Sequence, residues 1–176
     1  NGKTVSVSGV SLSSTDANNY SVVATGTTTA NITPRALTVV YTGVDKVYDG
    51  LLNASVTTSL TNANGYVNGD VLTVNRTANF VDKSVAYDNA QAVAPVNIDV
   101  TSVSLSGTDA ANYSVAATGS ASAKITPKSL AVNLTGSITK TYDGNTDATL
   151  TSANYNLTGF VTVAGVTEGA TITKTT

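Results

Sequence analysis

The sequence predicts an all-β protein with little helix, built as modules in series that are either immunoglobulin-like β-sandwiches or β-grasp-like folds. Two observations lead to this class. Apolar residues alternate with Thr, Ser and Asn at a period of two, which is typical of half-buried strands. The whole pattern then returns after 93 residues, a period too long for a solenoid coil and close to the length of an immunoglobulin-like module.

The alternation also shows where a strand is interrupted. In both copies it slips by one residue, after Val7 and again after Val100, which predicts a β-bulge or a strand break. Leu, Glu, Lys and Gln never accumulate at helical spacing, so helices are not expected. The clearest alternating segments are Val5/Val7, Leu37/Val39/Tyr41, Val96/Ile98/Val100 and Leu130/Val132/Leu134.

Three segments carry the internal repeat, and their spacing indicates the organisation of the chain. The offset is 93 for two of them and 94 for the third, because one residue is added in a loop. Each segment with its copy is as follows: 10–22 and 103–115, 32–37 and 125–130, and 46–50 and 140–144.

This period predicts three parts of an internal piece of a longer protein. Residues 1–34 are the C-terminal part of one repeat, 35–127 form a complete repeat, and 128–176 are the N-terminal part of the next. Pro34 and Pro127 mark the two joins, and a basic residue and a new strand follow each proline at once. Such short connections favour a stiff arrangement of neighbouring repeats.

Thr-Asp-Ala-x-Asn-Tyr, present in both copies, predicts a single helical turn. Asp16 caps the turn in the first copy, and Tyr20 is expected to return into the core. Asp109 and Tyr113 take the same roles in the second copy.

A Tyr-Asp-Gly triplet predicts a tight turn with its tyrosine packed in the core, because Asp-Gly is a strong turn signal. A catalytic or metal-binding triplet is the weaker interpretation. The triplet occurs as Tyr48, Asp49 and Gly50, and again as Tyr142, Asp143 and Gly144.

The composition argues against most reactive sites. The 176 residues include no Cys, His, Met or Trp, which removes disulfides, thiolate and imidazole chemistry and the usual transition-metal ligands. Charged residues make up 11%, against roughly 25% in an ordinary domain, and the net charge of -2 comes without a basic cluster. Nucleic acid and membrane surfaces are therefore not expected partners.

The remaining candidate chemistry is weak. Glu168 is the only Glu, so a glycosidase carboxylate pair is not recognisable, and no Asp-x-Asp-x-Asp-Gly loop supports calcium. The sequence thus predicts no enzyme, no cofactor and no metal site. Four kinds of candidate residue remain: Asp70, Asp82, Asp88 and Asp99 for calcium; Lys46, Lys83 and Lys140 for Lys–Asn cross-links; Asn19, Asn31, Asn53, Asn75, Asn112, Asn133 and Asn156 as Asn-x-Ser/Thr glycosylation sites; and Tyr41, Tyr66, Tyr87 and Tyr155 for sugar or receptor binding.

Four ordered motifs resemble those of a known family. They are Lys-x-Tyr-Asp-Gly, Phe-Val-Asp-Lys at 80–83, Val-Ser-Leu-Ser-x-Thr-Asp-Ala-x-Asn-Tyr and Ile-Thr-Pro-Lys. Together they resemble the YDG-type repeats, often found beside similar MBG domains, of large bacterial filamentous-haemagglutinin-like adhesins and exoproteins. The resemblance implies an extracellular or cell-surface stalk built from many copies, and it implies no activity.

We therefore expect structural stalk or spacer repeats that contribute to attachment or biofilm, with neighbouring repeats of the same protein as partners. Two alternatives stay open. One is a fibre-forming subunit, in which 128–176 of one copy and 1–34 of another complement each other through strand edges. The other is a module that binds a glycan or a host or matrix protein directly.

Overall fold

The structure, a computed structural model, describes residues 2–137, 139–147 and 149–172. The protein is all-β, as predicted, and the helices within these ranges are single 3-10 turns of three residues. None of them is long and apolar enough to cross a membrane. The chain divides into two compact units, the first made of residues 1–38, 60–74 and 105–116, and the second of 39–59, 75–104 and 117–176.

The first unit contains two small sheets. The strands β1 (Lys3–Ser8) and β2 (Thr25–Ala30) form an antiparallel hairpin. The strands β3 (Arg35–Leu37) and β10 (Tyr113–Val115) pair in parallel, with Tyr113 opposite Arg35. The 3-10 turns of this unit are η1 (Ala17–Asn19), η2 (Asn62–Asn64) and η3 (Ala110–Asn112).

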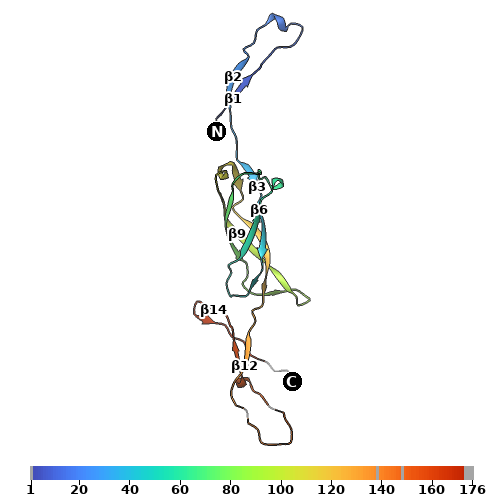
Figure 1. Cartoon of the computed structure of the whole chain (residues 1–176), viewed down its shortest axis with the longest axis vertical. Coiled ribbons are helices and arrows are strands. Elements are labelled where there is room, and N and C mark those ends of the chain that lie inside the picture. The colour runs from blue at the N-terminus through green and yellow to red at the C-terminus, as the bar shows by residue number, and fades with distance from the viewer. Residues whose placement is uncertain (1, 138, 148, 173–176) are drawn as a thin grey trace. The chain divides into compact units, whose positions relative to one another are not determined.

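The second unit is centred on a curled, mixed sheet that resembles half a barrel (Figure 1). Its strand order is β5-β11-β9-β7, with β8 also paired to β9; β5 runs parallel to β11, whereas β11 and β8 run antiparallel to β9. The strands have these bounds: β5 Lys46–Val47, β7 Thr73–Phe80, β8 Ala86–Tyr87, β9 Val93–Ser106 and β11 Gly119–Thr126.

Short antiparallel pairs complete the second unit. One pair is β4–β6, one is β12–β13, and one is the small hairpin β14–β15. The 3-10 turn η4 (Ser152–Asn154) precedes β13. The strands have these bounds: β4 Val40–Val44, β6 Ser55–Ser59, β12 Ala131–Leu134, β13 Tyr155–Thr158, β14 Thr162–Val163 and β15 Val166–Thr167.

The predicted slip in the alternation is confirmed in both copies. Ser102 has a left-handed φ of 54° inside β9, and Val103 resumes bonding by donating its amide to Ala117 O at 3.0 Å. Gly9 stands 93 residues earlier, has a φ of 70°, and follows the end of β1. The same repeat position is therefore left-handed in both copies, and it makes a bulge in one copy and a strand break in the other.

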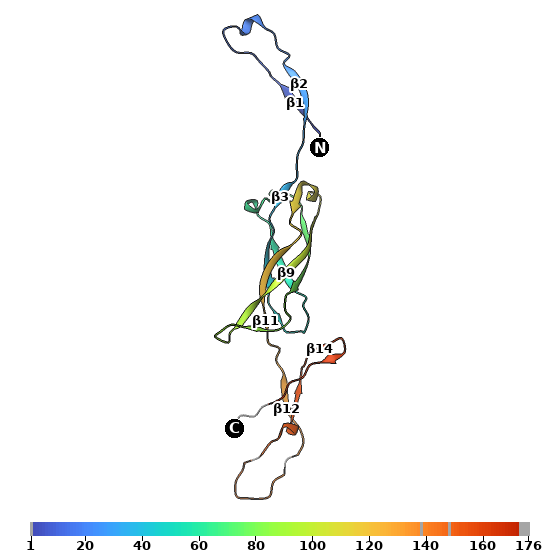
Figure 2. The ribbon, with the colours of Figure 1, turned by 180° about the vertical axis from the view of Figure 1, so that it is seen from behind.

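The core of the second unit lies where β9 and β11 run side by side (Figure 2). Large side chains of β9 stand opposite small residues of β11: Ile98 pairs with Ala121, and Val100 pairs with Gly119. Both Ile98 and Val100 are fully buried, as is Ile125 at the end of β11. Because the β11 residues at these positions are small, strand β4 can approach β11 closely, and the ring of Tyr41 on β4 lies directly over Gly119.

This close approach gives a prediction with an internal control. A Cβ at Gly119 would lie 2.4 Å from Cε2 of Tyr41, whereas Gly26, its counterpart 93 residues earlier, has no atom within 4 Å of its Cβ position. We expect Gly119→Ala to lower the free energy of unfolding by about 1–3 kcal/mol through overpacking. Gly26→Ala should change it by less than about 0.5 kcal/mol. Urea unfolding of the two variants tests this, and equal effects would contradict it.

Candidate functional site

The first Tyr-Asp-Gly triplet forms a tight turn held by a lysine. Asp49 Oδ1 accepts the Leu51 amide at 3.0 Å, and Gly50 has a left-handed φ of 75°. Lys46 Nζ donates to Asp49 Oδ1 at 2.8 Å and to the backbone oxygens of Leu51 and Asn53 at 2.7 and 3.0 Å. The predicted turn is confirmed. Partial burial raises the pKa of Asp49, but the Lys46 hydrogen bond, the Leu51 amide and the charge of Lys46 together outweigh it, and the net pKa lies below the usual 3.8.

The second triplet makes the same turn. Lys140 Nζ lies 2.8 Å from Asp143 Oδ1, and that oxygen accepts the Asn145 amide at 3.1 Å. The Lys140 hydrogen bond lowers the pKa of Asp143. Gly144 has a φ of 81°. The lysine and aspartate thus form a local clamp that is independent of what surrounds it.

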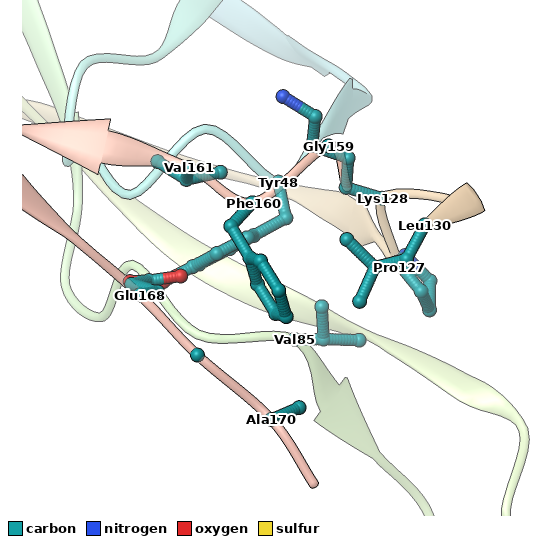
Figure 3. A pocket seen from close by; sticks show the side chains of 11 residues that line it. Tyr48, Val85, Pro127, Lys128, Leu130, Gly159, Phe160, Val161, Glu168 and Ala170 are labelled. Atoms are coloured by element: carbon teal, nitrogen blue, oxygen red, sulfur yellow. The ribbon is translucent and has the colours of Figure 1, made fainter. Parts of the chain in front are cut away.

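The two tyrosines of the triplets have different surroundings. Tyr48 is half-buried, whereas Tyr142 is 91% exposed, so the prediction of a core position is wrong for Tyr142. Tyr48 donates its hydroxyl to Glu168 Oε1 at 2.5 Å (Figure 3), and this hydrogen bond raises the pKa of Tyr48 above 10.0. Sequence reasoning considered Glu168 only as an unpaired carboxylate. The one sequence feature that distinguished Glu168 is that it is the only Glu of the chain.

An open cavity of about 270 Å³ adjoins Tyr48 (Figure 3). Apolar side chains surround most of it, with Pro127 and Lys128 from the predicted join on one side. The remaining lining residues include Val85, Leu130, Phe160 and Val161. Its apolar lining and its single acidic group are better suited to packing between segments than to holding a charged substrate.

A second polar cluster surrounds Tyr113, which is buried as predicted. Tyr113 donates its hydroxyl to Asp70 Oδ2 at 2.5 Å and accepts the Val67 amide at 3.0 Å. Pro34 and Arg35, at the other predicted join, line a cavity of about 240 Å³ together with Tyr113. Both prolines therefore lie beside a tyrosine that is hydrogen-bonded to an acidic side chain.

The predicted helical turns are confirmed as η1 and η3, but two details are wrong. Neither Asp16 nor Asp109 makes a side-chain cap. Asp109 Oδ2 instead accepts the Val71 amide at 2.8 Å, so its side chain fixes a neighbouring segment. Tyr20 is 72% exposed, because the segments that cover Tyr113 have no earlier copy in this chain.

Several of the other candidate residues have local roles. Asp82 accepts the Ser84 amide, and Asp88 accepts the amides of Ala90 and Ala92, as in turns. Within the described ranges, no three His, Cys, Asp or Glu side chains are close enough to hold a metal ion together. Tyr41 covers Gly119 and Tyr66 donates its hydroxyl to Asp70 O at 2.7 Å; Tyr155 is half-buried, and Tyr87 is 52% exposed.

Comparison with protein families matches residues 33–121, just over half of the chain, to the YDG domain. The chain belongs to the YDG domain family. No curated protein and no solved structure gives a significant match. The matched range holds the first triplet with its lysine clamp and the buried Tyr113, so the hydrogen-bonded turn and the tyrosine–aspartate pair both belong to the YDG domain.

The Tyr113 cluster predicts a loss of stability in alkali. Burial, and then the hydrogen bond to Asp70, raise the pKa of Tyr113 above 10.0, although the hydrogen bond from the Val67 amide and the charge of Arg35 oppose this. The folded protein then holds this proton to higher pH than the unfolded chain. The stabilisation is complete below about pH 10 and is lost as the pH rises through the raised pKa.

We expect the free energy of unfolding, measured in urea from about pH 8 to about pH 12, to fall less in Tyr113→Phe than in the unaltered protein. Tyr20→Phe is the matched control, because Tyr20 is the exposed repeat counterpart, and its profile should be unchanged. Identical profiles for the two variants would contradict the prediction.

Proposed function

We propose that the chain is a run of non-catalytic stalk or spacer repeats from a bacterial cell-surface or secreted adhesin, which contributes to attachment or biofilm. The observation that carries this proposal is the join at Pro127. The strand β11 ends at Thr126 and β12 begins at Ala131, so four residues connect them. Thr126 O accepts the Tyr48 amide at 2.8 Å, which anchors the chain immediately before the proline.

The surface chemistry supports the same proposal. The surface is rich in Thr, Ser and Asn and poor in charge, and the acidic residues described above serve turns, a lysine clamp or a tyrosine. A repeat of this kind supplies length and contact area without a reactive group. Neighbouring repeats of the same protein are its expected partners, and the host receptor is expected to contact another part of the adhesin.

Small-angle X-ray scattering on chains with one, two and four complete repeats tests the stalk. For stiff joins, each doubling of repeats should nearly double the maximum dimension. A compact body would grow by a factor of only about 1.3 per doubling. As a control, six Gly/Ser residues inserted after Lys128 should reduce the factor to about 1.4, the value for a flexible chain. Compact growth in the unaltered chains would refute the stalk.

A second candidate, assembly of copies end to end, is supported by exposed apolar residues in the incomplete repeats. Val5 and Val7 are 39% and 44% exposed, whereas their counterparts Ile98 and Val100 are fully buried. In residues 128–176, Leu130 is 37% exposed, against 5% for its counterpart Leu37. The strand β12 and the first hairpin of a second copy would cover one another, by strand addition.

Analytical sedimentation tests this assembly. We expect the protein to associate as its concentration rises, and Val7→Asp to abolish association, because the charge would be buried at the strand interface. Val81→Asp is the control, since Val81 is 56% exposed in the complete repeat and should not affect association. A monomer at all concentrations, or equal effects of both variants, would rule the assembly out.

A further inference from the structure

The two Tyr-Asp-Gly turns share a lysine–aspartate ion pair and a left-handed glycine but have different surroundings. Both have a lysine clamp and a left-handed glycine, with φ values of 75° at Gly50 and 81° at Gly144. Gly50 is buried, whereas Gly144 is exposed and has no atom within 4 Å of its Cβ position. The difference therefore comes from a segment that covers the first turn.

That covering segment is the hairpin of β14 and β15, residues 161–168. Its turn is formed by Ala164 and Gly165, which both have left-handed φ values, 51° and 81°, as a two-residue hairpin requires. The Glu168 amide donates to Val161 O at 2.9 Å and closes the hairpin. A hairpin this short is marginal on its own in water, so packing must stabilise it.

One face of this hairpin fits the first turn. Val163 is on β14 and Val161 immediately precedes that strand; they are two residues apart along an extended segment and therefore share a face. A Cβ at Gly50 would lie 2.8 Å from Val163 Cγ2 and 3.0 Å from Val161 Cγ1. Val161 is 7% exposed, so this contact removes it from water. Glu168 stands on the same face and accepts the Tyr48 hydroxyl.

We propose that the Tyr-Asp-Gly turn is a socket for the next repeat: its glycine leaves room for two valines of that repeat's hairpin, and its tyrosine hydroxyl binds the hairpin's carboxylate. The partner is thus a β-hairpin with adjacent apolar side chains on one face and a Glu at its end. Tyr142 and Gly144 present the same surface uncovered. The inference rests on the proposed function only in treating 35–127 and 128–176 as consecutive repeats.

The socket explains each residue of the triplet. Asp49 and Lys46 form the turn, which exposes the flat backbone of Gly50 to the hairpin. Any side chain at that position would displace the valines. The hydrogen bond to Glu168, together with burial beside the hairpin, raises the pKa of Tyr48 above its usual 10.0.

Amide hydrogen exchange on the full chain, read at residues 161–168, tests the socket with two matched glycine variants. Gly50→Ala and Gly144→Ala carry the same left-handed backbone strain, and only the first meets the valines. We expect Gly50→Ala to accelerate exchange of the hairpin roughly 5- to 150-fold. Gly144→Ala should leave it unchanged. Equal acceleration in both, or hairpin amides that exchange at unprotected rates in the unaltered chain, would overturn the proposal.

Exchange of the core amides at Ile98 and Ile125 would reveal whether Gly50→Ala fails to fold. In that case a pair of tyrosine variants tests the socket instead. Tyr48→Phe should accelerate hairpin exchange about 2- to 10-fold, through loss of one hydrogen bond, and Tyr142→Phe should not. No difference between them would also overturn the socket. Hydrogen exchange at the hairpin tests the socket, and X-ray scattering tests the stalk. The two measurements are independent, so failure of the socket can be distinguished from failure of the stalk.

Discussion

The close approach of β4 to β11 is the constraint on which the second unit depends. A Cβ at Gly43 on β4 would lie 2.3 Å from Ser122 O, and the Tyr41 ring occupies the space over Gly119. Glycines are therefore required at the two points of closest approach, Gly43 and Gly119, and β9 supplies the large side chains opposite this part of β11. Ile98 and Val100 of β9 are completely buried there. Aliphatic side chains fill the space that the closely packed backbones leave.

Hydrogen bonds from a few charged groups then fix the turns that this core cannot fix. Lys46 is an example, because its amine binds two backbone oxygens that lie outside the named strands, and the same amine nitrogen lies 5.3 Å from the centre of the Phe80 ring. Asp109 fixes Val71 in the same manner. A protein with so few charges uses them at irregular backbone, where an unsatisfied donor or acceptor would be costly.

Periodicity and repetition were sufficient to predict the all-β class, the slip at Ser102 and the turns at Asp49 and η3, because each is set by residues within a few positions. The failures have one physical cause. The exposure of Tyr20 and Tyr142 and the role of Asp109 depend on which distant segment lies opposite, and a repeated motif does not encode that. Likewise, the partner of Tyr48 stands 120 residues away, and no feature of the sequence around Tyr48 indicates it.

The position of buried residues also bears on how stability would be shared along a run of repeats. Val161 follows Pro127 in the sequence, yet it packs against the turn at Gly50, which precedes that proline. On the proposed docking, each repeat would complete part of its neighbour's core, so unfolding one repeat would expose apolar surface on the next. Nearest-neighbour coupling of this kind makes terminal repeats the least stable and internal repeats mutually supporting. A stalk under load would then begin to unfold at its ends, and the internal joins would keep their geometry.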